Sequence, residues 1–384
     1  MMQAVVLAGG EGHRLRPLTR GIAKVMIPVA NKPIIDYVLD ALVKNGINDI
    51  IVVVGYRREQ LIRHLNNTDY PVTVVTQKKQ IGTANALLCA KDLINGRFLL
   101  LPGDNYIDAE SLSRIKNEDN AVLISEHPYP SNFGVVKVSD GKISGIREKP
   151  GETESSIVST GIFSFDTDIF RFLDRCEIPE IIEYLKRSGR SFKAVTTECW
   201  RDAIYPWDLL RMNKRTLEMI SPQFSGKISR NAVISGKVSI GEGTTIAPGA
   251  VIQGPAIIGE GCEIGPNSCI MPGVSVGNRT KVGAFTCIEN SIVMEDSVIG
   301  SHSLVKDSVI GSGCILLDHI STVSTRSLVE TESGLIRGRF GAILGDGVEA
   351  APFTVFKGAI AGSGSKIEIG RTIEGILPEN SIVR

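Results

Sequence analysis

The feature that most restricts the fold of this chain is a repeat of six residues in its C-terminal part. Every sixth residue from Ile228 to Ile288 is isoleucine or valine, over eleven consecutive positions. A period of six with an aliphatic residue at one fixed phase is typical of a left-handed parallel β-helix, in which each hexapeptide repeat forms one flat side of a triangular coil. A run of independent hairpins would not keep one phase over this length. The phase slips by one before Val293 and before Ile310, and from Leu316 to about Phe340 the repeat is lost.

The N-terminal part has a different pattern, in which apolar runs of strand length alternate with helical patterns. The expected strands are Gln3–Leu7, Asp49–Gly55, Val72–Val75 and Phe98–Pro102, and the expected helices are Pro33–Asn45, a short one around Leu61 and Leu65, and Ala84–Leu93. This alternation indicates βαβ units on a mainly parallel sheet, that is, an α/β domain. Because 384 residues are too many for one ordinary core, we expect an α/β domain over 1–221 and a β-helix domain over 222–384.

The charge balance excludes some classes of partner. Lys plus Arg and Asp plus Glu both number 42, so no net charge draws the protein to nucleic acid or to a membrane surface. The longest aliphatic run, Ile50–Val54, is far shorter than the ~20 residues of a membrane span. No basic stretch followed by an apolar segment marks a signal peptide at the N-terminus. We therefore expect a cytoplasmic protein with neither nucleic acid nor membrane as a partner.

The cysteines are consistent with that location, because none of them form a Cys-x-x-Cys pair. Their scatter predicts reduced, mostly buried thiols, with a structural disulfide as the alternative. The seven are Cys89, Cys176, Cys199, Cys262, Cys269, Cys287 and Cys314.

A glycine-rich loop directly follows the first expected strand. It contains Gly9, Gly10 and Gly12, and three glycines in four positions let the backbone approach a ligand and point N–H groups at phosphate oxygens. Arg14 would add a bidentate contact to a phosphate, and Lys24 a point charge. The spacing fits neither the dinucleotide fingerprint nor the Walker loop. Taken alone, this turn is also consistent with a purely structural role.

The segments that follow the loop make its interpretation more specific. It reads Gly-Gly-x-Gly-x-Arg-Leu-x-Pro-Leu-Thr, followed by Lys24 and by Pro-Val-x-x-Lys-Pro-Ile from Pro28, and so resembles the signature of the sugar-1-phosphate nucleotidylyltransferases. The resemblance continues, in order, through Gln77 with Gly82-Thr83-Ala84, Gly103-Asp104, Phe133–Val136, Arg147–Pro150, Thr160–Ile162, and Trp200–Asp202 with Tyr205–Leu210. It covers roughly residues 3 to 215. With the coil attached, the chain resembles the bifunctional, archaeal type that combines UDP-N-acetylglucosamine pyrophosphorylase with an acetyltransferase.

The resemblance implies a Rossmann-like nucleotidyltransferase domain and a definite reaction. A sugar-1-phosphate oxygen attacks the α-phosphorus of a nucleoside triphosphate and expels pyrophosphate, which requires positioning and charge neutralisation more than a protein nucleophile. Asp104 and Asp202 would hold Mg²⁺, which binds through few protein ligands. Arg14 and Lys24 would grip the triphosphate and the departing pyrophosphate.

The same resemblance implies how the two substrates are bound. Gln77 and Thr83, beside Gly82, would read the edge of the base, with Gly10 near the base or ribose. Glu148 would accept hydrogen bonds from the sugar hydroxyls, Lys149 would hold the sugar phosphate, and backbone groups near Gly134 and Thr160 would complete the pocket. The spacing of Gln77 and Gly82 favours UTP over dTTP.

Three positions depart from the family pattern. His13 stands where a small hydroxyl residue is usual, Ala23 where a proline is usual, and Ser159 where an asparagine usually helps to hold the sugar. The identity of the sugar, of the glucose or N-acetylglucosamine type, therefore stays open.

Each assignment also has a plainer alternative. An aspartate after glycine is most often a turn residue, so the role of Asp104 depends on its place at a strand end, the edge at which parallel sheets bind ligands. Asp202 alone would be a surface acid, and Lys149 a solvated turn lysine. We interpret Trp200 and Trp207 as core or cleft-wall residues instead of groups that stack on a base.

The coil raises the question of a second activity. Acetyl transfer from acetyl-CoA to an amino sugar phosphate requires a general base, and His302 stands about where the family has one. However, Leu304 and Val305 follow where a tyrosine is expected, and residues 317–324 lack the expected asparagine-bearing segment. For the coil, the alternatives are an acetyltransferase and an oligomerisation or regulatory platform. For the whole chain, the alternative to an active nucleotidylyltransferase is a catalytically silent regulatory subunit that binds sugar nucleotides. Flat-sided coils of this kind assemble as trimers, so we expect a homotrimer or a multiple of it.

Overall fold

The structure is a computed structural model that describes residues 2–153, 155–173, 178–331 and 334–384. Its contacts divide the chain into two compact units. The first unit consists of Met1–Glu11, Ala23–Met26 and Ile34–Asp202, and the second of Gly12–Ile22, Ile27–Pro33 and Ala203–Arg384. Two short N-terminal segments thus belong to the same unit as the C-terminal coil. The expected boundary at residue 221 stays a prediction.

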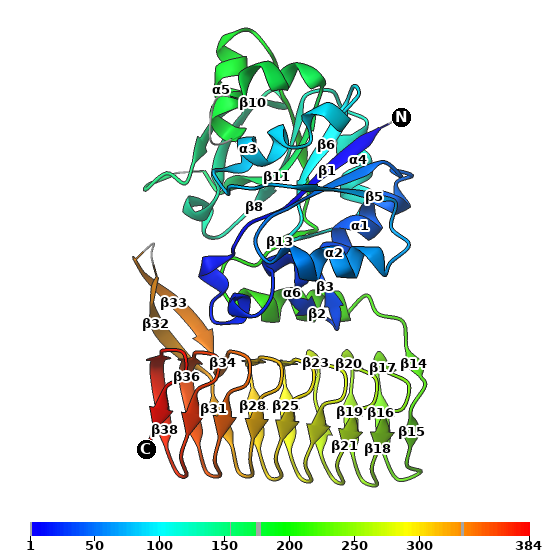
Figure 1. The fold of residues 1–384 in the computed structure, drawn as a ribbon, viewed down its shortest axis with the longest axis vertical. Coiled ribbons are helices and arrows are strands. Elements are labelled where there is room, and N and C mark those ends of the chain that lie inside the picture. The colour runs from blue at the N-terminus through cyan, green and yellow to red at the C-terminus, as the bar shows by residue number, and fades with distance from the viewer. Residues whose placement is uncertain (1, 154, 174–177, 332–333) are drawn as a thin grey trace. The chain divides into compact units, whose positions relative to one another are not determined.

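The first unit is built on a mixed sheet of nine strands, which Figure 1 shows with the helices around it. The strands are β1 (Gln3–Ala8), β4 (Ile50–Val54), β5 (Val72–Thr76), β6 (Phe98–Pro102), β8 (Ala121–Glu126), β9 (Gly134–Ser139), β10 (Lys142–Glu148), β11 (Ile157–Phe165) and β12 (Lys193–Thr196). The helices are α1 (Ile34–Lys44), α2 (Arg58–Asn66), α3 (Thr83–Leu88), α4 (Ala109–Lys116) and α5 (Ile178–Arg187). The strand order is β5-β4-β1-β6-β11-β8-β12-β10-β9.

The four expected strands are all present and form the parallel half of this sheet. β1 pairs in parallel with β4 and with β6, and β4 pairs with β5. All five residues of β4 are buried, which explains why the run Ile50–Val54 is aliphatic without alternation. The expected helix Ala84–Leu93 is shorter, because α3 ends at Leu88 and a 3₁₀ turn follows over Lys91–Leu93.

The other half of the sheet contains antiparallel pairs that the sequence analysis did not anticipate. β11 runs antiparallel to both β6 and β8, and β9 forms an antiparallel hairpin with β10. The hairpin turns at Asp140 and Gly141, which have φ angles of 50° and 71°. Positive φ at both positions is what a tight hairpin turn requires, and Asp-Gly is its usual sequence.

A separate two-stranded ribbon matters most for function. β7 (Asn105–Ile107) follows β6 almost directly, and it pairs antiparallel with β13 (Trp200–Asp202). In this register Asp202 lies opposite Asn105. The ribbon therefore brings residue 202 beside the segment that follows β6, although the two are far apart in the sequence.

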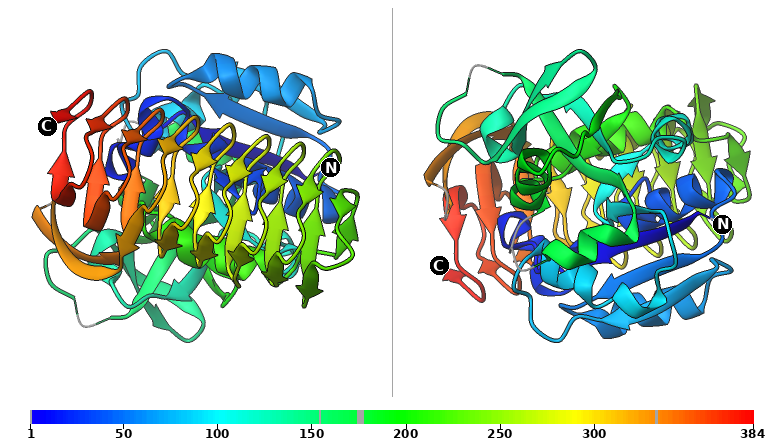
Figure 2. Two further views of the ribbon diagram at one scale, coloured as in Figure 1. Left: turned by 90° about the horizontal axis from the view of Figure 1, so that it is seen from below. Right: turned by 90° about the horizontal axis from the view of Figure 1, so that it is seen from above.

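The coil of the second unit confirms the repeat of six (Figures 1 and 2). Ile246 pairs with Ile264, one full turn of three repeats later, and Ile240 pairs with Ile258. After the first phase slip the pairs are one residue closer, as in Val282 with Ile299. The aliphatic residues of the repeat are fully buried in one continuous core, except near the first turn, where Ile228 is exposed.

The coil strands occupy three faces. The first contains β14 (Gln223–Phe224), β17 (Val238–Ile240), β20 (Ala256–Ile258), β23 (Val274–Val276), β26 (Ile292–Val293), β29 (Val309–Ile310) and β34 (Ala342–Leu344). The second contains β16 (Val233–Ser235), β19 (Val251–Gln253), β22 (Cys269–Ile270), β25 (Cys287–Glu289), β28 (Leu304–Lys306) and β31 (Ser321–Val323), and β36 (Val355–Ala361) and β38 (Thr372–Leu377) span both. The third contains β15 (Lys227–Ile228), β18 (Thr245–Ile246), β21 (Glu263–Ile264), β24 (Lys281–Val282), β27 (Val298–Ile299), β30 (Ile315–Leu316), β35 (Glu349–Ala350), β37 (Lys366–Ile367) and β39 (Ile382–Val383).

The loss of the repeat after Leu316 has a simple cause. β32 (Thr325–Thr331) and β33 (Gly334–Phe340) form an antiparallel hairpin that is inserted into one turn of the coil. After the hairpin the coil resumes, since Ile310 pairs with Leu344. The insertion interrupts the period without ending the fold.

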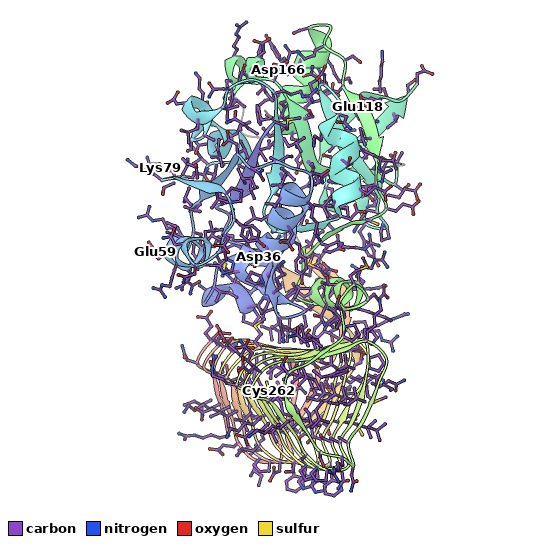
Figure 3. All side chains as sticks on the ribbon, turned by 90° about the vertical axis from the view of Figure 1, so that its right-hand side faces the viewer. Asp36, Glu59, Lys79, Glu118, Asp166 and Cys262 are labelled. Atoms are coloured by element: carbon purple, nitrogen blue, oxygen red, sulfur yellow. The ribbon has the colours of Figure 1, made fainter. Side chains whose placement is uncertain are left out.

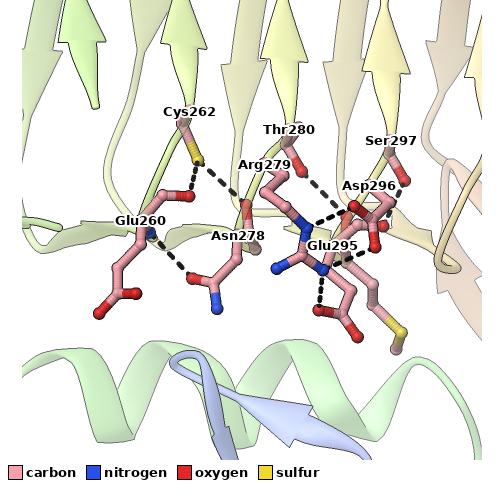
Figure 4. A network of polar contacts seen from close by, with 10 residues as sticks. Glu260, Cys262, Asn278, Arg279, Thr280, Glu295, Asp296 and Ser297 are labelled. Carbon is pink, nitrogen blue, oxygen red and sulfur yellow. Dashed lines mark hydrogen bonds and ion pairs between the residues drawn. The ribbon is translucent and has the colours of Figure 1, made fainter. Parts of the chain in front are cut away.

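Exposed charges at the corners of the coil join successive turns (Figure 4). The Arg279 guanidinium donates to both carboxylate oxygens of Asp296, at 2.6 and 2.7 Å, and to Glu295 at 2.8 Å. Because these groups are exposed, we expect this network to contribute little to stability.

A buried asparagine holds the remaining parts of the second unit together. Asn213 lies on α6 (Asp208–Leu217), and its Oδ1 accepts from the backbone N–H of Ala30 at 2.7 Å and from the Ser275 hydroxyl. Its Nδ2 donates to the Gly273 carbonyl at 3.0 Å. Ala30 connects the short strands β2 (Pro28–Val29) and β3 (Lys32–Pro33). One fully buried side chain thus ties the helix and this ribbon to the coil.

The six described cysteines are all free thiols, as expected, and Cys176 lies outside the described residues. The expectation that the thiols are mostly buried is wrong for these six. Only Cys262, which Figure 3 marks in the coil, and Cys314 are buried, while the other four are partly exposed. Among the described residues, no helix has the length and apolar character needed to cross a membrane.

Candidate active site

The centre of the candidate site is an ammonium group between two carboxylates. Lys24 lies in a 3₁₀ turn (Lys24–Met26), Asp104 follows the end of β6, and Asp202 ends β13. The Lys24 Nζ lies 2.5 Å from Asp104 Oδ2 and 3.5 Å from Asp202 Oδ1. The side chains are 16%, 24% and 19% exposed, so all three are largely but not completely removed from water. The structure thus brings together three of the residues that the sequence analysis proposed for the site, and the roles given to them stay predictions.

The electrostatics of this cluster fix the charge of the lysine. Burial alone would lower the pKa of Lys24, but the negative charges of Asp104 and then Asp202 outweigh it and raise the pKa well above its ordinary value. The ammonium therefore stays protonated at neutral pH. Lys24 is suited to holding negative charge and not to accepting a proton.

The two carboxylates also suit a divalent cation. Mg²⁺ prefers carboxylate oxygens, keeps several of its waters and needs only one or two protein carboxylates beside phosphate oxygens of a substrate. Asp104 and Asp202 approach one cationic point from two elements, which is the donor set that such an ion needs. Throughout the described part of the chain, no group of three or more His, Cys, Asp or Glu side chains forms a complete cage for a metal.

The glycine-rich loop begins beside Gln77. A Cβ atom on Gly9 would lie 3.0 Å from Gln77 Oε1 and 3.4 Å from the backbone nitrogen of Gly55, so only glycine fits without displacement of a neighbour. Gly10 is exposed, and a Cβ atom there would meet nothing within 4 Å, so its backbone borders open space. The Gly9 carbonyl accepts a hydrogen bond from Tyr56 N at 3.0 Å. The ends of β1 and β4 therefore lie against each other next to the Gln77 side chain.

Gln77 is held in place by its neighbours. It is 5% exposed, and its Nε2 donates to Asn85 Oδ1 at 3.0 Å and to the Gly82 carbonyl at 3.4 Å. Gly82 has a φ of 101°, which favours glycine, and Thr83 begins α3. The sequence analysis missed Asn85, although its position two residues after Thr83 was a usable signal.

A second group of predicted residues gathers around Gly134. A Cβ atom on Gly134 would lie 3.2 Å from Glu148 Oε2 and 3.7 Å from the Cβ of Ser159. Glu148 Oε1 lies 2.9 Å from Lys149 Nζ, and the Lys149 backbone has a positive φ of 37°. The predicted sugar-binding residues thus share one end of the β9–β10 hairpin with Ser159, the residue that departs from the family pattern.

Thr160 connects this group to the segment that contains Asp104. Its hydroxyl is used internally, since it donates to the Leu123 carbonyl at 2.9 Å. Its carbonyl accepts from Asn105 Nδ2 at 3.0 Å. Asn105 is 2% exposed and directly follows Asp104. The sequence analysis did not name Asn105, whose side chain anchors the chain next to Asp104.

Gly12 and Arg14 belong to the second unit. Gly12 adopts the left-handed conformation with φ 69°, and its carbonyl accepts hydrogen bonds from Leu15 N at 2.9 Å and from the Thr19 hydroxyl at 3.0 Å. Gly12 is therefore a turn residue that starts the 3₁₀ segment His13–Leu15. That Arg14 joins Lys24 and the two aspartates stays a prediction.

His302, the candidate base in the coil, is part of a ladder of rings. It stacks on Phe285 with ring centroids 5.0 Å apart and on His319 at 5.1 Å, and His319 stacks on Phe353 at 4.6 Å. All four residues have φ angles between 57° and 61° and occupy one corner of successive turns. The corner geometry gives His302 a structural role.

The sequence and the geometry together define the class of protein. The Nucleotidyl transferase family profile matches residues 3–218, and a profile described as the GMPPB C-terminal domain matches residues 252–370. The chain belongs to the nucleotidyl transferase family and is a nucleotidyltransferase.

Named relatives narrow the class. The chain is 37% identical to "Bifunctional protein GlmU" of Methanococcus maripaludis strain C7, and the match covers all of this chain and 97% of the relative. It is 35% identical to the protein of the same name from strain S2, of which the match covers 62%. It is 38% identical to "UTP--glucose-1-phosphate uridylyltransferase AglF" of Haloferax volcanii, over 56% of this chain and 97% of the relative. A crystal structure assigned as a glucose-1-phosphate thymidylyltransferase from Bacillus anthracis matches 58% of this chain and 98% of its own, with a TM-score of 0.53 and 28% identity.

Proposed function

We propose that this protein transfers a nucleotidyl group from a nucleoside triphosphate to a sugar 1-phosphate and releases pyrophosphate. The observation that carries the proposal is the Lys24 ammonium held between Asp104 and Asp202 at the ends of two adjoining elements. The names of the relatives, which include enzymes for glucose 1-phosphate, support the same reaction.

In this proposal the protein aligns two anions and neutralises their charge. Mg²⁺ bound by Asp104 and Asp202 would supply positive charge at the α-phosphate and at the leaving pyrophosphate. Lys24, permanently protonated, would keep the two carboxylates in place and attract the triphosphate. Backbone N–H groups at Gly9 and Gly10 would bind phosphate oxygens.

The transfer itself needs no proton carrier. A phosphate oxygen of the sugar 1-phosphate is already ionised at neutral pH, so it attacks the α-phosphorus directly. The bond from the α-phosphorus to the bridging oxygen breaks, and that electron pair leaves with the pyrophosphate. The protein contributes by positioning the attacking oxygen in line, for which Glu148 and Lys149 would hold the sugar 1-phosphate.

We further propose UTP as the preferred nucleotide and a sugar of the glucose or N-acetylglucosamine type. Gln77, fixed by Asn85 and Gly82, is suited to hydrogen-bonding the edge of a pyrimidine. The relative in Haloferax volcanii is a uridylyltransferase by name. Ser159 lies beside Gly134 and stands where the family usually has an asparagine that helps to hold the sugar, so the contacts to the sugar would differ at this position.

Two other readings receive less support. A silent regulatory subunit would be expected to lack one of the charged groups, whereas Arg14, Lys24, Asp104 and Asp202 are all present. For an acetyltransferase the base would be His302, which instead forms part of the ring ladder. Acetyl-CoA with glucosamine 1-phosphate, assayed for free thiol, tests that activity.

We also propose a cytoplasmic homotrimer, or a multiple of it, assembled through the coil.

The proposed reaction is tested by incubating the protein with Mg²⁺, each nucleoside triphosphate and a set of sugar 1-phosphates while pyrophosphate is measured. We expect release with UTP and either glucose 1-phosphate or N-acetylglucosamine 1-phosphate. Asp104→Asn, which keeps the size of the side chain and removes its charge, should reduce kcat at least about a hundredfold. The exposed Asp92→Asn is the matched control and should be fully active. Folded protein that releases no pyrophosphate with any pair would refute the proposal.

A further inference from the structure

The second unit contains a cavity that the proposed reaction does not use. Its volume is about 580 Å³, within the range of small-molecule sites. It is lined by residues of the segment 13–20, which follows the glycine-rich loop, by residues 205–207, by Val329 and Glu330 of β32, and by residues of the last turns of the coil. Ile360, Ile376 and Leu377 give the coil side an apolar surface. This cavity would shield a ligand with an apolar or weakly polar body from water.

The loop side of the cavity is rich in cationic groups. Arg14, Arg16 and Arg20 all line it, together with His13. The Nε of Arg20 is held by Glu379 Oε1 at 2.5 Å, which fixes the guanidinium at the wall. Guanidinium groups present several donors in a planar fork and are the side chains best suited to phosphate. Three arginines on one wall therefore favour an anionic ligand with a phosphate group.

A buried hydroxyl provides an independent indication of a ligand. Tyr205 lines the cavity and is 5% exposed, and its hydroxyl oxygen is buried without a hydrogen-bond partner in the described parts of the chain. Burial raises the pKa of Tyr205, so the hydroxyl keeps its proton and is a donor at neutral pH. Buried polar groups without a partner are rare, because such a group loses its hydrogen bonds to water and gains none in return. A ligand oxygen would satisfy this hydroxyl.

The ring of Tyr205 is positioned by its neighbours. It stacks on Trp207 with centroids 5.0 Å apart, and Trp207 stacks in turn on Phe340 at 5.2 Å. Gly338 lies so close to Trp207 that a Cβ atom there would be 2.8 Å from the indole ring. The hydroxyl is thus held by a rigid stack instead of a mobile side chain.

We propose that this cavity binds an organic phosphate, with its phosphate group on the arginine wall and on the Tyr205 hydroxyl, and its body against the apolar wall. Two sources share this chemistry, namely sugar phosphates and nucleotides. The lining of this cavity includes Arg14 but none of Lys24, Asp104 and Asp202. The coupling rests on the proposed function: if Arg14 binds the triphosphate, as the family resemblance implies, the ligand would alter the affinity for the triphosphate, and the triphosphate would alter the affinity for the ligand by the same factor.

The first test measures binding without turnover. Calorimetric titration of the Asp104→Ala protein uses glucose 6-phosphate, UMP, inorganic phosphate and, as an uncharged control, glucose. We expect a site for glucose 6-phosphate, or a second site for UMP beyond the substrate site, and none for glucose. These two arms distinguish the sources. If inorganic phosphate binds as tightly as both organic phosphates, or if nothing binds, the proposal is wrong.

Two variants locate the binding at the cavity. Tyr205→Phe removes only the oxygen atom, and Arg20→Gln removes one charge; each should weaken the organic phosphate about tenfold or more. The Tyr205 hydroxyl has no partner among the described residues, so Tyr205→Phe should leave the urea midpoint of unfolding unchanged. If the hydroxyl had a purely structural role, its removal would lower that midpoint. Tyr184→Phe and Arg230→Gln are matched controls outside the cavity lining. Unchanged binding in both cavity variants would overturn the assignment.

A third measurement tests the coupling separately. With wild-type protein, the ligand identified by titration should change the KM for UTP in the pyrophosphate assay, and this change should disappear in Tyr205→Phe. Inactivity of the wild-type protein would contradict the proposed function and leave the binding result standing. Binding of the ligand with no effect on KM would remove the coupling through Arg14.

Discussion

Replacing Lys24 by methionine isolates the contribution of the ammonium in the candidate site. The substitution keeps the length of the side chain and removes the charge between Asp104 and Asp202. At an effective dielectric constant of about 20, ion pairs at the observed 2.5 and 3.5 Å correspond to about 7 and about 5 kcal/mol of Coulomb attraction. The cost of removing three charged groups from water offsets most of this. We therefore expect the free energy of unfolding to fall by about 1–3 kcal/mol.

The catalytic effect should be larger than the effect on stability. Removing one preorganised cation that acts on the developing charge reduces kcat by about 10²–10³ in comparable sites. A second effect concerns pH. Without the ammonium, the negative charges of Asp104 and Asp202 repel each other with no cation between them, so protons compete more strongly with Mg²⁺ for the pair. The acid side of the pH–rate profile should then shift to higher pH.

The assay is pyrophosphate release with UTP and N-acetylglucosamine 1-phosphate or glucose 1-phosphate between pH 5 and pH 9. Lys24→Arg, which retains the charge, should recover part of the rate and the original acid limb. Lys44→Met, on the exposed end of α1, is the matched control. A Lys24→Met protein with kcat/KM within about threefold of wild type and an unshifted acid limb would refute the role that the geometry assigns to Lys24.

Two further predictions concern stability and the thiols. Asn213→Ala removes three buried hydrogen bonds and leaves Ala30 N without the one that it makes to Asn213. The free energy of unfolding measured with urea should therefore fall by about 2–4 kcal/mol, and a loss below about 0.5 kcal/mol would contradict this. Burial raises the pKa of the Cys314 thiol from 9.0 to about 12, so this cysteine should not react with a thiol reagent at pH 8 until urea unfolds the protein. In the unfolded protein the Cys314 thiol ionises at a lower pH than in the folded protein. The free energy of unfolding should therefore fall as the pH rises from about 9 toward 12, and Cys314→Ala should remove this pH dependence.

The sequence was sufficient for the architecture because its periodic signals are strong. A fixed aliphatic position every six residues predicts the coil and its core, and Ile246 and Ile264 stack as that period requires. The antiparallel half of the first sheet was missed for a physical reason. The direction of its strands is set by the turns between them, and the Asp140-Gly141 turn signal was not used. The hairpin β32–β33 was seen only as a gap in the period.

The site was predicted in part, because the family segments name the residues and not the elements that position them. Lys24, Asp104 and Asp202 were named from those segments, and their side chains lie together in the first unit. No local pattern, however, indicates that β13 pairs with β7, since that pairing depends on the folding of the whole first unit. Asn105 was missed because it acts through a hydrogen bond to a residue far along the chain, whereas the position of Asn85, two residues after Thr83, was a signal that was not used.

The β7–β13 ribbon explains how the charges come to lie at one point. Asp104 immediately precedes β7 and Asp202 ends β13, so the antiparallel register that places Asp202 opposite Asn105 also fixes the separation of the two carboxylates. The hydrogen bond from Asn105 to the Thr160 carbonyl anchors the same ribbon to β11, which carries Ser159. A register shift of one residue would turn Asp202 to the opposite face of the ribbon. The geometry of the candidate metal site and that of the sugar-binding group thus depend on the same short pairing, and a change in the ribbon should affect both substrates together.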